Sequence, residues 1–237
     1  MKHPETKFEY MKFHHLRPAY EEGMKVIESM NFSTPTLINQ YPAFIGHLTL
    51  SRFLALYEAY KMVLNIAGHI AEVGMDMGTT SLYFAKLAKI YEPNTNTLVH
   101  GFDWFKGANP TNEERYIKKG DYKADFKIVT KLIASQGMQH SVHVHNLDAS
   151  KDLEIFFKEN PHLQFKLVFI DCGIYSVVSS SLKHFWSRLT PGGMLLLDHY
   201  SFELAPGEIR AVRDILPKVK FMQFPFAWMP CAYAIKE

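Results

Sequence analysis

The chain has 237 residues, which is enough for one large α/β domain or two small ones. Hydrophobic residues make up 47% of it and charged residues 21%, as in globular proteins with a full core, and the formal net charge of +2 argues against a nucleic-acid-binding surface. The two cysteines, Cys172 and Cys231, exclude a disulfide framework and a zinc-cysteine cluster and favour a reducing, cytoplasmic location.

The first part of the chain is predicted to be helical. Residues 1–15 are polar and lack the apolar stretch of a signal peptide, and no apolar run reaches the ~18–20 residues of a transmembrane helix. Residues 17–30 carry apolar side chains at helical spacing, whereas prolines interrupt residues 31–50 and indicate an irregular segment. Ser51 is a candidate N-cap for a long helix that follows it. We therefore expect residues 1–67 to form a helical cap or lid.

From residue 68 to the C-terminus, strands alternate with helices. The predicted strands are 69–74, 97–103, 141–148, 165–171, 192–200 and two within 219–237. The predicted helices are 79–91, 125–136, 151–160, 177–189 and 207–216. This alternation predicts an α/β domain over residues 68–237, Rossmann-like, with a doubly wound and mostly parallel sheet of seven strands. Ligands of such a sheet bind at the carboxyl ends of its strands.

The segment IAEVGMDMG, residues 70–78, joins the first strand of this domain to its first helix. Gly74 and Gly78 suit a tight turn and the close approach of a ligand to the main chain, with Glu72 before them and Thr79 after them. A dinucleotide-binding loop would carry a further glycine between these two to admit a diphosphate, so the spacing disfavours a nicotinamide-dependent oxidoreductase. The segment resembles the first motif of class I methyltransferases. The resemblance implies that these four residues bind the amino-acid end of S-adenosylmethionine.

Acidic residues close the next three strands as well. Asp103 ends the second strand, where it can accept hydrogen bonds from both ribose hydroxyls, and the neighbouring Trp104 is expected to contact the cofactor too. Asp148 ends the third strand and can bond the adenine amino group, and Asp171 ends the fourth. Acids at four successive strand ends indicate a nucleoside site. The stretch 104–124 beside it is long enough to act as a lid.

Three further segments narrow the resemblance. FDWFKG (102–107), FIDCGIYSVVSSSLKHFWSRLTPGGMLLLDHYS (169–201) and GEIRAVRDIL (207–216) are similar to the macrocin O-methyltransferase, or TylF-like, family. The likeness runs from about Tyr41 to the C-terminus. Members of that family methylate sugar hydroxyls on antibiotics and related glycosides, so the resemblance implies a sugar acceptor.

The same resemblance implies a divalent metal ion, usually magnesium. The family pattern I-D-G-D-x-Y is matched at Asp171, but Gly173 stands where the second acid is usual. The pattern D-D-Y is matched at Asp198, but His199 replaces its second acid. The implied metal ligands are therefore Asp171, Asp198 and His199. An imidazole among the ligands favours manganese, iron or zinc over magnesium.

Two catalytic arrangements remain open from the sequence. A metal ion held partly by Asp171 would lower the pKa of an acceptor hydroxyl and orient it for attack. Without a metal, a neutral His199 would act as general base. We expect an S-adenosylmethionine-dependent O-methyltransferase acting on a glycoside, a nucleotide sugar or a surface glycan. We also expect it to assemble as a homo-oligomer, a dimer, and to bind no nucleic acid. The alternatives are a noncatalytic or metal-independent protein that binds S-adenosylmethionine, and a methyltransferase for a phenol or catechol.

Overall fold

The computed structural model describes residues 11–112, 114 and 116–237. Residues 1–10 lie outside the described residues, and they make up most of the segment for which the sequence predicted no signal peptide. Residues 113 and 115 of the predicted lid also lie outside them. Within the described part of the chain, no helix is both long enough and apolar enough to cross a membrane.

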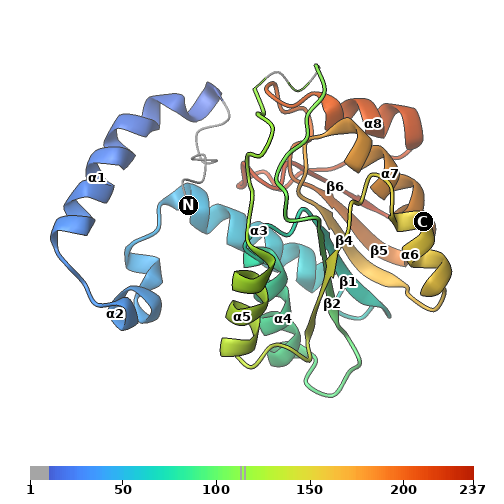
Figure 1. Ribbon diagram of the computed structural model, residues 1–237, viewed down its shortest axis with the longest axis horizontal. Helices are drawn as coiled ribbons and strands as arrows, with labels where there is room; N and C mark the ends of the chain where they lie inside the picture. The colour runs from blue at the N-terminus through green and yellow to red at the C-terminus, as the bar shows by residue number, and fades with distance from the viewer. Residues whose placement is uncertain (1–10, 113, 115) are drawn as a thin grey trace.

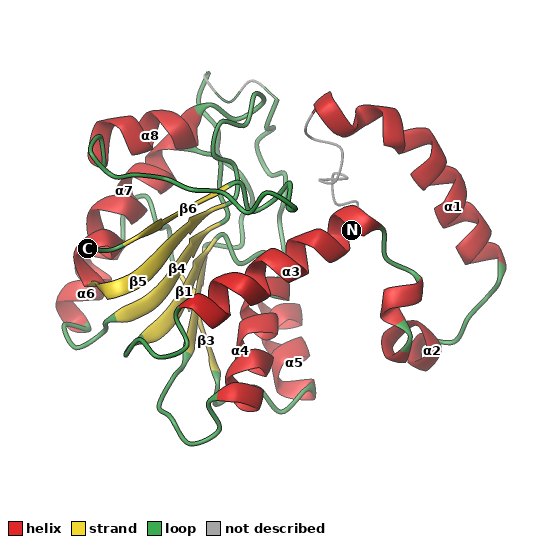
Figure 2. Ribbon diagram, turned by 180° about the vertical axis from the view of Figure 1, so that it is seen from behind, coloured by secondary structure: helices red, strands yellow, loops and turns green. Residues whose placement is uncertain are grey.

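Several helical segments precede the sheet. They are η2 (Met11–Leu16), α1 (Arg17–Ser29), α2 (Thr34–Asn39), η3 (Tyr41–Ala43) and α3 (His47–Met62). Helices α1 and α2 bury none of their side chains and stand apart from the sheet, beyond one end of α3 (Figure 1, Figure 2). Helix α3 packs against the rest of the molecule and buries Ala55, Leu56, Ala59 and Tyr60. The role of residues 1–67 as a cap stays a prediction.

Residues 31–50 are more regular than the sequence predicted. The prediction treated prolines there as breaks, but Pro35 lies in the first turn of α2, where proline is tolerated, and the Ser33 side chain accepts a hydrogen bond from the Thr36 amide as an N-cap. The prediction of Ser51 as the N-cap of α3 was wrong. The helix begins at His47 after Gly46, and the Ser51 hydroxyl donates to the carbonyl of Leu48 at 2.8 Å. Arg52 therefore lies inside the helix and not in its first turn.

The predicted α/β fold is confirmed. The strands are β1 (His69–Val73), β2 (Val99–Asp103), β3 (Val142–Asn146), β4 (Phe165–Ile170), β5 (Leu189–Leu197) and β6 (Ala232–Ile235). Their order is β3-β2-β1-β4-β5-β6; β1 to β5 pair in parallel and β6 pairs antiparallel to β5. The strand order reverses between β1 and β4, and this switch point is where ligands of open α/β sheets bind.

The described residues form six strands in place of the seven predicted. In the segment predicted to hold the additional strand, Met222 makes an isolated antiparallel bridge with Tyr233 of β6. Pro217 and Pro225 lie on either side of Met222. Because proline has no amide hydrogen to donate to a ladder, strand pairing stops after a short distance there.

Helices cover both faces of the sheet. They are α4 (Thr79–Tyr91), α5 (Phe126–Ser135), α6 (Leu153–Glu159), α7 (Tyr175–Phe185), η4 (Trp186–Arg188) and α8 (Gly207–Ile215). Alternate residues of β4 belong to different core clusters: Phe169 shares one with buried side chains of α3, α4 and α5, and Val168 shares the other with those of α6, α7 and α8. The two groups of helices lie on opposite faces of the sheet (Figure 1). The carboxyl ends of the five parallel strands consequently meet at one edge, between the two helical layers.

Candidate active site

A cavity of about 420 Å³ opens at the carboxyl ends of the parallel strands. This volume lies in the range of ~300–1,000 Å³ usual for small-molecule sites. Nine of the predicted site residues line it: Glu72, Gly74, Thr79, Asp103, Trp104, Asp148, Asp171, Asp198 and His199. Gly78 has a different place, as the N-cap of α4 with φ +78°. Parts of the predicted lid, including Tyr116 and Tyr122, also face the cavity.

Gly74 is required by a close approach between two main-chain segments. Its φ is +89°, and a Cβ atom there would lie 2.2 Å from the carbonyl oxygen of Asp171. The Asp171 amide in turn donates to the carbonyl of Val73 at 2.8 Å. The glycine thus brings the loop after β1, on the predicted cofactor side, directly against the loop after β4.

Asp103 organises the loops around the cofactor side. One carboxylate oxygen accepts from the Asp76 amide at 2.9 Å and the other from the Phe105 amide at 2.7 Å. Burial raises the pKa of Asp103, while these backbone hydrogen bonds act in the opposite direction. The neighbouring Trp104 is fixed by a hydrogen bond from its indole nitrogen to the carbonyl of Gly107 at 2.7 Å. Each Asp103 oxygen has a second lone pair with which to accept from a ligand.

The carboxylate of Asp148 bonds residues of the turn in which it lies. Strand β3 ends at Asn146, and Asp148 lies in the turn beyond it. One of its carboxylate oxygens accepts from the amide and the hydroxyl of Ser150, at 3.0 and 2.6 Å, and the other pairs with Lys151 at 3.2 Å. Despite the opposing effect of partial burial, these contacts hold the pKa of Asp148 below its usual value. Its predicted bond to an adenine amino group stays a prediction.

Glu72 lines the cavity but is almost fully buried. The residue is 2% exposed, and the hydroxyl of Ser81 donates to its carboxyl group from α4. Burial raises the pKa of Glu72 to about 8, which outweighs the hydrogen bond from Ser81. The carboxyl group is therefore largely protonated at neutral pH.

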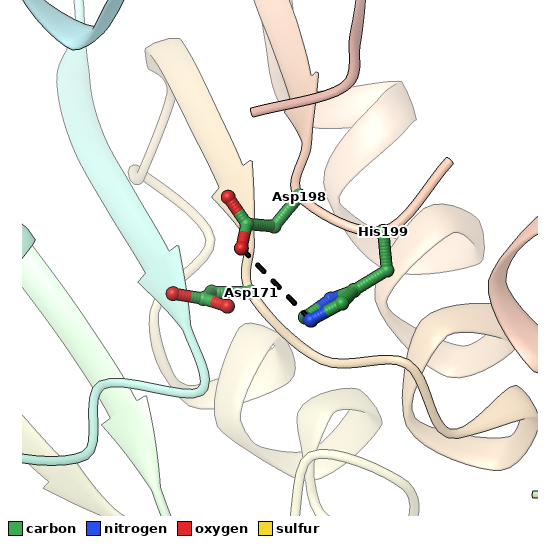
Figure 3. Close-up of side chains that lie close together, drawn as sticks. All are labelled: Asp171, Asp198 and His199. Carbon is green, nitrogen blue, oxygen red and sulfur yellow. Dashed lines mark ion pairs between the residues drawn. The ribbon is translucent and has the colours of Figure 1, made fainter. Parts of the chain in front are cut away.

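The three residues predicted as metal ligands lie together. The side chains of Asp171, Asp198 and His199 point toward one another at the ends of β4 and β5 (Figure 3), with ligand atoms within 4.8 Å of one another. Asp198 and His199 approach to 3.9 Å between Oδ2 and Nε2. Burial, and then the charge of Asp198, raises the pKa of Asp171 to about 7. Burial also lowers the pKa of His199 to about 4, so its imidazole is neutral at pH 7.

Sequence reasoning missed Arg52, which reaches this cluster from α3. Its Nη1 donates to Asp198 at 2.5 Å and its Nη2 donates to Asp171 at 2.8 Å. Side-chain exposure is 20% for Arg52, 25% for Asp171 and 3% for Asp198. The ion pairs are thus largely shielded from water.

Arg52 determines how well a divalent metal ion fits between Asp171, Asp198 and His199. Two carboxylates and a neutral imidazole are suitable ligands by type, and their spacing is close to that of a coordination shell. An ion would, however, have to compete with the guanidinium for oxygens of both carboxylates. With Arg52 in place, the arrangement does not fit a bound metal ion, and metal binding stays a prediction.

Two further residues, Gly173 and Glu208, lie at or next to the positions where the acidic pattern departs from the resembled family. A Cβ atom at Gly173 would lie 2.6 Å from the Cβ of Ala205, so an aspartate does not fit there. Glu208, in the first turn of α8, is fully buried and accepts from the His199 amide at 3.0 Å. Its other carboxylate oxygen is buried without a hydrogen-bond partner, and burial raises its pKa well above the usual value. Sequence reasoning missed Glu208, because an acid in a first helical turn is usually solvated.

Comparisons with known proteins agree with this geometry. A family model described as a methyltransferase domain matches residues 71–200, more than half of the chain. None of the curated proteins compared matches the sequence. A crystal structure of CalS11, a calicheamicin methyltransferase, is similar with a TM-score of 0.80 and 21% identity, covering 93% of this chain and 91% of that one.

Two other solved structures are similar as well. The apo structure of CalS11, described as a TDP-rhamnose 3'-O-methyltransferase of calicheamicin biosynthesis, gives a TM-score of 0.74 at 24% identity over 93% of both chains. The O-methyltransferase NovP gives 0.65 at 13% identity over 78% of this chain and 79% of its own. At these identities the likeness establishes the shared fold.

Proposed function

This chain belongs to the methyltransferase-domain family, and we propose that it transfers a methyl group from S-adenosylmethionine to a sugar hydroxyl. The observation that carries the proposal is that residues of the predicted donor and acceptor sites line one and the same cavity at the switch point. On one side it exposes Asp103 and the loop around Gly74, and on the other Asp171 and His199. A nucleoside-bearing donor and a hydroxyl acceptor would thus meet at the same strand ends.

The donor side suits a cofactor without phosphates. Asp103 can accept hydrogen bonds from ribose hydroxyls, and the loop after β1 presents backbone to the amino-acid end of the donor. We assign Glu72, Gly74, Gly78, Thr79, Trp104 and Asp148 to the same donor site, in contact with the ligand or in support of its loops. Glu72 and Gly78 belong to the supporting group, since Glu72 is buried and Gly78 lies off the cavity wall.

The acceptor side favours a neutral glycoside over a nucleotide sugar. Arg52 is the one arginine or lysine among the described residues that line the cavity, and both of its terminal nitrogens are bonded to carboxylates. A diphosphate needs cations to balance its charge, whereas this lining offers it carboxylates, including Asp103, Asp171 and Asp198, which repel it. Apolar rings, including those of Phe202 and Trp228, give the acceptor's aglycone a surface to pack on.

Asp171 is the general base that the electrostatics favour. With a pKa of about 7 it is half ionised at neutral pH and can take the proton of a bound hydroxyl as its oxygen attacks the methyl carbon. The carbon–sulfur bond breaks as the carbon–oxygen bond forms, and the sulfonium becomes a neutral thioether. His199, with a pKa of about 4, is neutral but a weaker base. Its position within 4.8 Å of Asp171 and Asp198 supports a role in orienting the acceptor hydroxyl.

The proposal is tested by incubating the purified protein with methyl-labelled S-adenosylmethionine and three acceptor classes: neutral glycosides, TDP-sugars and catechols. We expect label in neutral glycosides and in no other class, and transfer slower by roughly 10²–10⁴-fold in the Asp171→Asn variant. If only catechols or only TDP-sugars were labelled, the proposed acceptor class would be wrong and the labelled class would be the acceptor. Cofactor binding without transfer to any class would favour a noncatalytic binding protein.

A further inference from the structure

Arg52 connects the N-terminal helices to the reacting end of the cavity. It lies on α3, on the side of the helix that also carries the buried Leu56 and Tyr60. Its partners, Asp171 and Asp198, follow different strands and are 119 and 146 residues away in sequence. The ion pairs of Arg52 are therefore long-range tertiary contacts between α3 and the strand ends, and not contacts within the helix.

The guanidinium is held on three sides. Its two terminal nitrogens donate to different carboxylates, one to Asp171 and one to Asp198. Its Cζ atom also lies 5.5 Å from the ring centroid of Phe169 on β4, within the range of a cation–π contact. The planar fork of an arginine suits such a bridge, because it presents several donors in fixed directions.

The charges leave room for one cation at this position. The two carboxylates carry at most two negative charges, and Arg52 already supplies one positive charge between them. Adding a divalent ion would place three positive charges beside them, with the sulfonium of the proposed donor as a fourth nearby. Cations this close repel strongly where water is largely excluded.

We propose that Arg52 is the resident cation of this site, and that its guanidinium takes the position of a divalent metal ion between Asp171 and Asp198. This inference deepens the proposed function, on which it rests for the meaning of the site. Arg52 is a positioning residue: it fixes both carboxylates and holds α3 against the cavity. Methyl transfer then proceeds with these side chains and needs no added metal ion.

The test is manganese binding, measured on the full chain from the electron paramagnetic resonance signal of free Mn²⁺. We expect the wild-type protein to leave that signal unchanged up to millimolar concentration. The Arg52→Gln variant keeps a polar side chain but removes the charge, so it is expected to bind one Mn²⁺ at least about tenfold more tightly than wild type. Adding Asp198→Asn to Arg52→Gln is expected to abolish that binding.

Lys61→Gln provides a matched control. It removes a positive charge from the same helix at an exposed position, where Lys61 pairs with Glu58 at 3.3 Å. This variant should behave like wild type. If Arg52→Gln does not fold by circular dichroism, Arg52→Met takes its place, since an unbranched apolar side chain fills the space of the arginine stem without its charge.

Two results would overturn the inference. One is a wild-type protein that binds one Mn²⁺ and loses it with Asp198→Asn. The other is a folded Arg52 variant that binds Mn²⁺ no better than wild type. Neither readout involves methyl transfer, so failure of the proposed function is recognised separately, by the absence of S-adenosylhomocysteine binding.

Discussion

Gly74 and Asp171 meet across the point where the strand order reverses, so closely that a Cβ atom on the glycine would lie 2.2 Å from the aspartate's carbonyl oxygen. The predicted donor loop and the predicted acceptor acid are therefore joined through their main chains. A disturbance at Gly74 is transmitted to Asp171 without passing through any side chain.

Replacing Gly74 by alanine should consequently damage both folding and ligand binding. The new Cβ meets backbone atoms, and the φ of +89° is unfavourable for alanine, so we expect a loss of roughly 2–4 kcal/mol in the free energy of unfolding. Urea denaturation measures it. The control is Gly23→Ala in α1, where a Cβ meets nothing within 4 Å and a helix former replaces glycine. Equal effects of the two substitutions would contradict this account.

Restoring the acid of the resembled family at position 173 should destabilise the protein. The side chain of Gly173→Asp would collide with Ala205, and we expect a cost of about 1–3 kcal/mol in the free energy of unfolding. Ala205→Gly removes the atom in conflict, so the double variant should recover a large part of that loss. A double-mutant cycle by urea denaturation measures the coupling, and purely additive effects would show that the collision is not the cause.

The Asp171→Asn variant should bind S-adenosylhomocysteine like wild type while its kcat falls by roughly 10²–10⁴-fold, the usual contribution of a general base. The base must be ionised, so the wild-type rate should rise with pH through about 7, the raised pKa of Asp171. The residual rate of the variant should not show this rise with pH. If the rise persists in Asp171→Asn, the general base is another residue.

The positions of Glu72, Asp103 and Asp171 were predictable because each acid lies at or next to the end of a largely buried strand, and parallel strands bring such ends to one edge. Other parts of the site depend on contacts that no local pattern contains. Asp148 ends a predicted strand, but β3 stops at Asn146 and the carboxylate serves its own turn. The tail resembles two strands in sequence, yet the prolines beside Met222 leave a single bridge.

Arg52 was the residue hardest to foresee. Its pairing with Asp171 and Asp198 depends on how α3 lies over the sheet edge, which sequence spacing does not define. One signal was nevertheless present: Arg52 lies four residues before Leu56 and eight before Tyr60, on the apolar side of the predicted helix. A lone arginine on such a face indicates a buried partner. Placing the helix start at Ser51 concealed it.

Histidines on β2 and β3 should make the stability fall in mild acid. Burial lowers the pKa of His100 to about 3 and that of His145 to about 4, and the two rings are hydrogen-bonded at 3.0 Å. The unfolded chain takes up these protons near pH 6.5 and the folded chain does not, so stability is full above pH 6.5 and is lost as the pH falls. Between pH 8 and pH 5 we expect a loss of about 2 kcal/mol for each such imidazole.

Urea denaturation of wild type and His100→Phe over this range tests the assignment. Phenylalanine keeps an aromatic ring beside Phe165 but cannot take up a proton. The pH dependence of its unfolding free energy should be smaller by about 2 kcal/mol between pH 8 and pH 5. An unchanged dependence would mean that the buried imidazole at position 100 is not its source.

The account depends most directly on the donor site, and isothermal titration calorimetry with S-adenosylhomocysteine examines that site alone. We expect one molecule to bind per chain, NADH not to bind, and Asp103→Ala to weaken S-adenosylhomocysteine binding at least about tenfold. The variant loses both backbone hydrogen bonds of Asp103 and the ribose contact that we propose for it. Absence of S-adenosylhomocysteine binding to the folded wild-type protein, or binding of NADH in its place, would contradict the central claim.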